Sequence, residues 1–201
     1  TRPGVFFQNL AGLIVLRRYS QYEKSDIKLA PILFTCLGAI IGAFCAGIIS
    51  NDAFDVVASI VLVFLTVQYL VPLPVKREEK GHRRKYLQSV LFVLVGFYAG
   101  FIQIGIGILL LAILLNQLSM PYAQANAYKL IIILIYTVPT TIYFAVTDVI
   151  LWRPALLITV GQVVGAAGAA AFISKNSRAK EVAKWTTIVM IIITLVKIWL
   201  F

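Results

Sequence analysis

The sequence predicts an all-α, polytopic transmembrane helical protein with two pseudo-symmetric, inverted repeats and a broken or re-entrant glycine-rich helix. Three observations predict this fold class. First, 61% of the 201 residues are hydrophobic and 13% are charged, whereas soluble chains are about 45–50% apolar. Second, the charged residues lie in short segments between long apolar ones. Third, two parts of the chain resemble each other at one fixed offset. This composition excludes a soluble enzyme and a free nucleic-acid-binding protein.

The net charge of +10 is concentrated in three segments. Fourteen of the 18 basic residues lie at 17–28, 76–85 and 175–184. Lys and Arg gather in the cytoplasmic loops of membrane proteins, so we expect all three segments on the cytoplasmic side. The turns at 51–52 and 147–153 hold more acidic than basic residues and are expected outside. A membrane explains this charge more simply than a nucleic-acid partner does.

The apolar segments follow one another at lengths suited to a membrane, which takes about 20 helical residues to cross. The first is shorter, so we interpret it as the tail of a helix and expect an N-terminal segment to be missing. The predicted helical segments are 3–16, 29–50, 53–71, 123–146, 154–173 and 185–201. The predicted domains are 1–75, the latter part of an N-terminal transmembrane repeat; 76–86, a basic cytoplasmic loop; and 87–201, a C-terminal transmembrane repeat.

Residues 87–115 form a long apolar stretch that contains the run GFYAGFIQIGIG. A glycine cluster at membrane depth is tolerated where neighbouring protein satisfies the freed backbone groups. The charge pattern requires this stretch to enter and leave on the cytoplasmic side, which favours a re-entrant hairpin. Two arms of about 14 residues would reach about 21 Å into a core of about 30 Å. One long tilted helix, with residues 116–122 outside, is the alternative.

The internal repeat has an offset of 127 residues. It places LGAIIGAFCAGIIS (37–50) over VGAAGAAAFISKNS (164–177), and it places Arg2 over Lys129. Equivalent loops then have opposite charge character, which is typical of two halves inserted in opposite senses. We therefore expect the two halves to be inverted repeats.

Lys129 is a basic residue inside an apolar segment. Insertion scales assign about 2.5–3.5 kcal/mol to such a side chain at the centre of a membrane helix. Its own segment contains no carboxylate, which favours an anion as its partner. Arg2 holds the equivalent position in the other half, so the two cations would form a convergent anion site. The alternative is that Lys129 lies near the cytoplasmic entry of its helix and extends to the headgroups.

Neutral donors accompany the two cations. Gln103 lies within FIQIGIG, and Asn126 lies one turn before Lys129. A glycine turn would add backbone N–H groups where it exposes a helix N-terminus. Each polar side chain, Gln162 included, could instead make an interhelical hydrogen bond. The candidate substrate-binding residues are Arg2, Gln103, Gly105, Gly107, Asn126, Lys129 and Tyr136.

Other residues that could form sites are interpreted as structural. Cys36 and Cys45 lie on opposite faces of one helix, so we expect neither a disulfide nor a metal pair. The one histidine, His82, lies in a basic loop, and the sequence has no HExxH motif, no GxSxG motif and no carboxylate pair in an apolar segment. We therefore expect no enzyme, no cofactor and no metal. Four glycines are interpreted as packing contacts between helices: Gly38, Gly42, Gly165 and Gly168.

Several runs of the sequence resemble a known family. The C-terminal half of the sulfite exporter TauE/SafE family of transporters is closely similar to GFYAGFIQIGIGILLLAIL, ANAYKLIIILIYT and LLITVGQVVGAAGAA. The later part of its N-terminal half is similar to TRPGVFFQN, the basic loop that follows and LGAIIGA. The resemblance covers nearly the whole chain. It implies export, or uptake, of small sulfur-containing anions such as sulfite or organosulfonates across the cytoplasmic membrane.

The residues and the resemblance together predict alternating-access transport of a small sulfur-containing anion. An anion channel and a non-transporting membrane scaffold are the alternatives. The expected partners are a small anionic substrate (sulfite or a sulfonate) and the lipid bilayer, without nucleic acid, and association into a homo-oligomer is open. The expected location is the cytoplasmic (inner) cell membrane, crossed several times. Asp55 is expected at the outer interface, so no intramembrane carboxylate is available as a proton relay.

Overall fold

The computed structural model describes residues 2–19, 28–70 and 82–175, together with positions 185, 186, 189, 193 and 196. The three described ranges contain seven α-helices and no β-strand. The helices are α1 (Arg2–Tyr19), α2 (Leu29–Ile48), α3 (Asn51–Leu70), α4 (His82–Phe101), α5 (Ile106–Gln117), α6 (Tyr122–Val146) and α7 (Trp152–Lys175). The all-helical prediction is confirmed for these ranges, and most of the predicted segment 185–201 lies outside the described residues.

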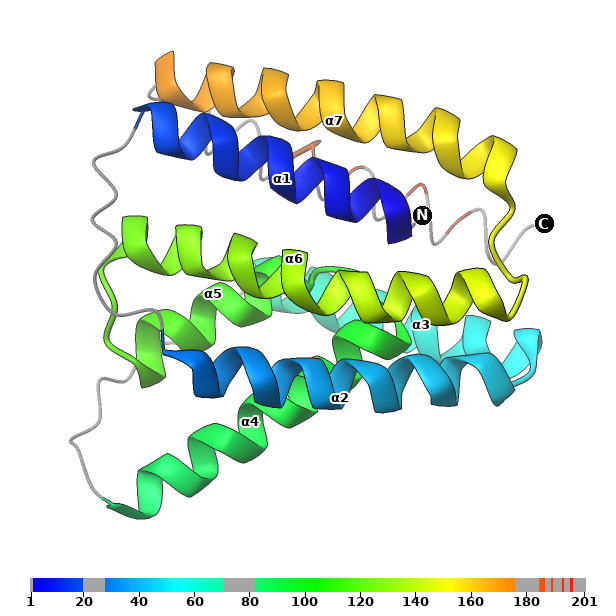
Figure 1. Cartoon of the computed structure of the whole chain (residues 1–201), viewed down its shortest axis with the longest axis horizontal. Coiled ribbons are helices and arrows are strands. Elements are labelled where there is room, and N and C mark those ends of the chain that lie inside the picture. The colour runs from blue at the N-terminus through cyan, green and yellow to red at the C-terminus, as the bar shows by residue number, and fades with distance from the viewer. Residues whose placement is uncertain are drawn as a thin grey trace.

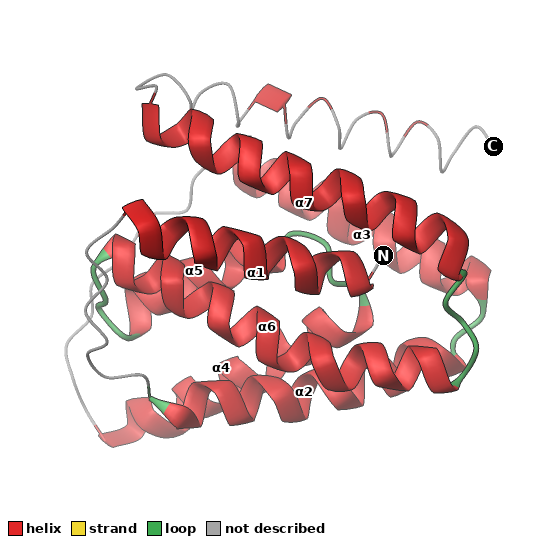
Figure 2. Cartoon of the chain, turned by 45° about the horizontal axis from the view of Figure 1, so that its top comes forward, coloured by secondary structure: helices red, strands yellow, loops and turns green. Residues whose placement is uncertain are grey.

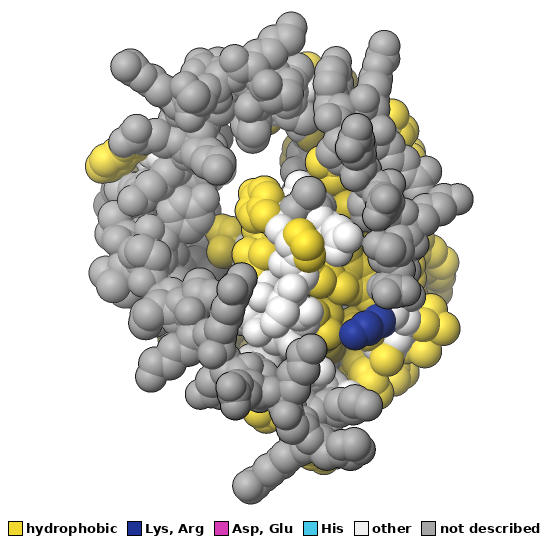
Figure 3. All heavy atoms as spheres, turned by 90° about the vertical axis from the view of Figure 1, so that its left-hand side faces the viewer, with side chains coloured by type: hydrophobic (Ala, Val, Ile, Leu, Met, Phe, Trp, Pro, Cys, Tyr) yellow, Lys and Arg dark blue, Asp and Glu magenta, His cyan; other side chains and the backbone are white. Residues whose placement is uncertain are grey.

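The helices form a bundle with two distinct ends (Figure 1). The end of α1, the start of α2, the start of α4 and the end of α7 all lie on the left in that view. The basic segments of the sequence adjoin these helix ends. The short α2–α3 and α6–α7 connections lie at the opposite end. Figure 3 looks onto the left-hand end, where hydrophobic and basic side chains of the described residues are visible.

The glycine-rich stretch is interrupted as the sequence predicts. Helix α4 ends at Phe101, the backbone turns at 102–105, and α5 begins at Ile106. Figures 1 and 2 show α5 returning toward the end of the bundle from which α4 came. The Gln88 side chain of α4 donates a hydrogen bond to the carbonyl of Gln117 at the end of α5, at 2.8 Å. The two ends of this helical hairpin are therefore tied together.

Glycines allow α2 and α4 to pack backbone against backbone. A Cβ atom on Gly38 would overlap the carbonyl oxygen of Val93 on α4. In the opposite direction, a Cβ on Gly96 would overlap the carbonyl of Thr35 on α2. Gly42 and Gly100 continue the same contact, so each helix contributes a pair of glycines four residues apart. Small residues at this spacing let membrane helices approach closely, which confirms the packing interpretation of the glycines in α2.

The glycines of α7 differ from those of α2. Among the described residues, nothing lies within 4 Å of a Cβ built on Gly165 or Gly168. The prediction that these two glycines pack against another helix is therefore wrong for the part of the chain that the structure describes. Helix α1 packs on α7, where Gly4 lies against Gln162 and Thr159.

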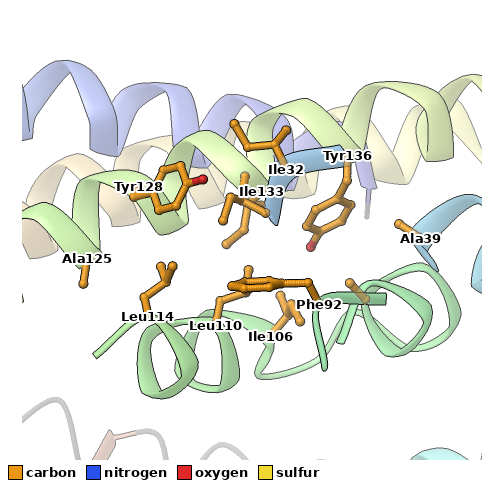
Figure 4. Close-up of a cluster of buried hydrophobic side chains, with 12 residues drawn as sticks. Ile32, Ala39, Phe92, Ile106, Leu110, Leu114, Ala125, Tyr128, Ile133 and Tyr136 are labelled. Carbon is orange, nitrogen blue, oxygen red and sulfur yellow. The ribbon is translucent and has the colours of Figure 1, made fainter. Parts of the chain in front are cut away.

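The buried core lies between α6 and the α4–α5 hairpin (Figure 4). Tyr136 and Ile133 project from α6 toward Ile106 and Leu110 of α5. Phe92 of α4 joins the same cluster, and Tyr136 and Leu110 are fully buried. Burying such apolar side chains stabilises the bundle within the protein, while many large apolar side chains of α2, α6 and α7 remain exposed.

Two described helices are long and apolar enough to cross a membrane, by length and composition: Leu29–Ile48 and Gln124–Val146. The arms of the hairpin contain shorter apolar helices, Tyr86–Phe101 and Ile106–Gln117. At about 1.5 Å per residue, the 12 residues of α5 span about 18 Å. This is well short of a hydrocarbon core of about 30 Å.

The offset of 127 found in the sequence also relates helix ends. Added to Tyr19, the end of α1, it gives Val146, the end of α6. Added to Ile48, the end of α2, it gives Lys175, the end of α7. Figure 1 shows α1 and α6 running in opposite directions along the bundle, and α2 and α7 likewise.

Gly38 and Gly165 form a matched pair for testing the packing of α2 on α4, because the offset of 127 relates them. We expect Gly38→Ala to lower the stability of the protein by about 1–3 kcal/mol, since the new methyl group meets backbone that cannot yield easily. Gly165→Ala should change it by less than about 0.5 kcal/mol. Thermal unfolding in detergent measures both, and equal losses of stability would contradict the packing account.

Candidate functional site

The turn between α4 and α5 is held by Tyr98. Its carbonyl accepts hydrogen bonds from the backbone N–H groups of Ile102 (2.9 Å) and Gln103 (3.3 Å). Its hydroxyl donates to the carbonyl of Ile104. Gln103 and Gly105 both have positive φ, 68° and 69°. A left-handed conformation is uncommon for glutamine, and such backbone persists where surrounding contacts enforce it.

Arg2 contacts this turn from the first helix. One guanidinium nitrogen, Nη2, donates a hydrogen bond to the carbonyl of Gly100, in the last turn of α4. The guanidinium carbon lies 4.3 Å from the centre of the Phe144 ring of α6, a cation–π contact. The carbonyls of the last helical turn lack partners within the helix and carry partial negative charge. Arg2 therefore provides a hydrogen-bond donor for one carbonyl at the helix interruption. Its positive charge stays inside the bundle.

Tyr136 and Gln103 extend the site toward the core. The Tyr136 hydroxyl faces the Gln103 side chain and lies in the electrostatic field of Arg2. Three polar atoms of this cluster are buried without a hydrogen-bond partner: Arg2 Nη1, Gln103 Nε2 and Tyr136 Oη. Buried donors without acceptors are costly and uncommon. One such atom on the cation, Arg2 Nη1, and two neutral ones beside it form a site suited to an acceptor-rich anion.

A cavity of about 460 Å³ leads to Arg2 and Gln103. The cavity is also lined by residues 149–151 of the α6–α7 connection, which lies at the end of the bundle opposite the basic segments. Phe101, Phe144 and Ile158 contribute to an otherwise largely apolar wall. The polar groups of the cavity are therefore concentrated where it meets the helix interruption.

Lys129 occupies a separate position. Its Nζ donates to Asn126 Oδ1 at 2.7 Å, and its side chain passes the first turn of α5 at Gly107. Lys129 lies seven residues before Tyr136 on α6, which is about 10 Å along the helix axis. The structure thus brings Arg2, Gln103 and Tyr136 together, with Gly105 in the adjoining turn. It groups Lys129, Asn126 and Gly107 two turns closer to the basic end.

Tyr98 and Phe144 are contacts that sequence reasoning missed. Tyr98 lies within the glycine run but is not charged and has no exceptional spacing, so no signal marked it. Phe144 is one of 12 phenylalanines in an apolar chain, and its contact with Arg2 depends on how α1 packs against α6. Gln162, a weaker candidate from the sequence, lies against Gly4 of α1 and has a buried carbonyl oxygen without a hydrogen-bond partner.

Acidic residues are absent from the helices that form the cluster. The sequence of α1, α4, α5 and α6 contains no Asp or Glu. Within the described residues, no group of three or more His, Cys, Asp or Glu side chains could hold a metal ion. Both cysteines are free. The cluster therefore offers hydrogen-bond donors and one positive charge. Among those residues there is no metal-binding group and no acid–base pair.

An apolar helical bundle with an interrupted helix and an internal cationic cluster belongs to the class of helical membrane transport proteins. The comparison with known families agrees with this class. The model of the family described as sulfite exporter TauE/SafE matches residues 3–198. The chain therefore belongs to the TauE/SafE sulfite exporter family of membrane transporters. No curated protein and no solved structure gives a match.

The role of Tyr98 in the turn can be tested by removing its hydroxyl group. We expect Tyr98→Phe to leave the fold intact and to speed hydrogen exchange at the amides of residues 102–107. A lost hydrogen bond of about 0.5–1.5 kcal/mol corresponds to a change of roughly twofold to tenfold. Mass spectrometry of the protein in detergent measures this exchange. Tyr86→Phe, on the same helix but 78% exposed, is the control, and an equal effect in both variants would refute the role.

Proposed function

We propose that this member of the family carries small sulfur-containing anions, sulfite or organosulfonates, and binds them at Arg2, Gln103 and Tyr136. The observation that carries the proposal is a buried group of three polar atoms, Arg2 Nη1, Gln103 Nε2 and Tyr136 Oη, none of which makes a hydrogen bond of normal geometry. An oxyanion supplies the missing acceptors and neutralises the charge. Hydrogen bonds between ionised partners are stronger than neutral ones, so the bound anion would stabilise a cluster that is otherwise costly.

Lys129, Asn126 and Gly107 are proposed to line the path of the anion between the cluster and the basic end of the bundle. The position of Lys129 near the start of α6, about 10 Å along the axis from Tyr136, supports this order. Gly105 and Gly107 flank the start of α5, where backbone N–H groups lack helical acceptors. A helix N-terminus carries partial positive charge and favours an anion. The path would therefore remain attractive to an anion without any acidic residue along it.

Alternating access is proposed to use two inverted repeats. The coincidence of helix ends at the offset of 127 and the opposite directions of α1 and α6 support this arrangement. Transporters of this type hold the substrate between the repeats, near interrupted helices, and expose it to each side in turn. The cavity that reaches Arg2 from residues 149–151 would be the open pathway on the outer side of the cytoplasmic membrane.

The transport proposal is tested with the protein in proteoliposomes, by uptake and counterflow of labelled sulfite and a small sulfonate. We expect saturable exchange, and we expect Arg2→Ala to lower the transport efficiency by about 10- to 100-fold, because hydrogen bonds to a charged group contribute about 1.5–3 kcal/mol. Arg153→Ala, which removes an exposed arginine at the start of α7, should have little effect.

The variants are compared only where circular dichroism and gel filtration show that they fold. Lys129→Ala in the same assay is expected to slow exchange while leaving anion binding at the Arg2 cluster. Anion currents that do not saturate would indicate a channel instead of a carrier. Equal activity of the wild type and Arg2→Ala would place the anion elsewhere, and an absence of flux for every anion tested would overturn the proposed transport.

We also propose that the α4–α5 hairpin is re-entrant, with both ends on the cytoplasmic side. Single cysteines at Tyr86 and at Ser119, both exposed, test this in a background in which Cys36 and Cys45 are replaced. An impermeant maleimide should label both positions from the cytoplasmic side. A cysteine at Asp148, in the exposed α6–α7 turn, should be labelled from outside. Labelling of Ser119→Cys from outside would instead indicate one long tilted helix.

A further inference from the structure

We infer that the cluster accepts singly charged oxyanions and rejects doubly charged ones, so that hydrogen sulfite rather than the sulfite dianion is the transported species. The inference rests on the proposed function and specifies the charge of its substrate. The physical reason is the number of charges and of hydrogen-bond donors that meet at the helix interruption.

The cluster contains one positive charge. Arg2 is permanently protonated, its Nη2 is engaged by Gly100, and the Phe144 ring covers part of the guanidinium group. One guanidinium nitrogen, Nη1, is left without a partner. The other two unpartnered groups, from Gln103 and Tyr136, are neutral donors.

A singly charged sulfo group matches this arrangement. It distributes one negative charge over three oxygen atoms, and the three donor groups come from α1, the 102–105 turn and α6. A doubly charged anion would keep one charge uncompensated among apolar side chains. An unpaired charge in such surroundings is strongly disfavoured.

Within the described residues, no second charged side chain lines the cavity that adjoins the cluster. Helices α2 and α5 contain no charged residue, and those of α4 lie at its start. Lys129 lies about 10 Å along α6 from Tyr136 and donates to Asn126. Arg153 at the start of α7 and Asp55 on α3 are exposed. The other titratable groups near the cluster are the Cys36 thiol and the Tyr98 phenol, which are neutral in their ordinary forms near neutral pH.

The test compares three anions in proteoliposomes that have the same pH on both faces. Methanesulfonate is a monoanion and sulfate a dianion throughout the range, whereas hydrogen sulfite loses its proton near neutral pH. We expect the KM for methanesulfonate to be constant from mildly acidic to mildly alkaline pH. The KM for total sulfite should rise about tenfold for each pH unit once the dianion predominates. Sulfate should bind about 100-fold more weakly than methanesulfonate, or not at all.

The outcomes separate this inference from the proposed function. If no anion is carried by folded protein, the transport proposal itself fails. If sulfate is carried as well as methanesulfonate, or if the KM for total sulfite does not change with pH, transport stands and the inference is wrong. Constant methanesulfonate kinetics serve as the control for any effect of pH on the protein, including its single histidine.

A variant that adds a positive charge tests whether the single charge of the cluster is the reason for rejecting dianions. Gln103→Lys places a second cation in the cluster, so it should lower the KM for sulfate by at least about tenfold relative to the wild type. Gln103→Met, of similar size but neutral, is the control and should not gain sulfate transport. If Gln103→Lys still carries methanesulfonate and gains no sulfate transport, the charge count does not explain the selectivity. If the variant does not fold, the comparison of anions in the wild type decides the inference by itself.

Discussion

The interruption of the helix at residues 102–105 is the constraint on which the rest of the structure depends. Broken backbone inside an apolar protein needs partners for its freed N–H and carbonyl groups. Arg2 supplies one partner through the carbonyl of Gly100, and Tyr98 supplies another through the carbonyl of Ile104. The first helix and the hairpin are therefore joined by a cation, and removing it would take the side-chain donor from the carbonyl of Gly100.

Much of the fold could be predicted from the sequence, because long apolar segments and charged loops set the helix boundaries within a few residues. The glycine run predicted an interruption, but its members have different roles. Gly96 and Gly100 pack against α2, whereas Gly105 adopts a positive φ at the turn. A single sequence does not separate these roles, because both require a missing side chain. The same ambiguity explains why Gly38 packs as predicted, whereas Gly165 has no packing contact among the described residues.

The sequence indicated which residues meet in the candidate site more completely than it indicated how they are arranged. Arg2, Gln103 and Tyr136 do meet, yet Lys129 lies two turns away with Asn126 as its partner. Equivalent positions in a sequence repeat do not converge automatically, since helices that run in opposite directions carry such residues toward opposite ends. A cluster with one cation and neutral donors differs from the paired-cation site that the repeat suggested.

Binding of an anion between Arg2 and Gln103, as proposed above, is tested most directly by an anomalous difference map. Crystals of the protein grown with selenite, the selenium analogue of sulfite, would locate the anion without reference to any transport assay. We expect one strong selenium peak within hydrogen-bonding distance of Arg2 Nη1 and Gln103 Nε2. A peak at Lys129 and Asn126 with none at Arg2, or no peak in the bundle at saturating selenite, would contradict it.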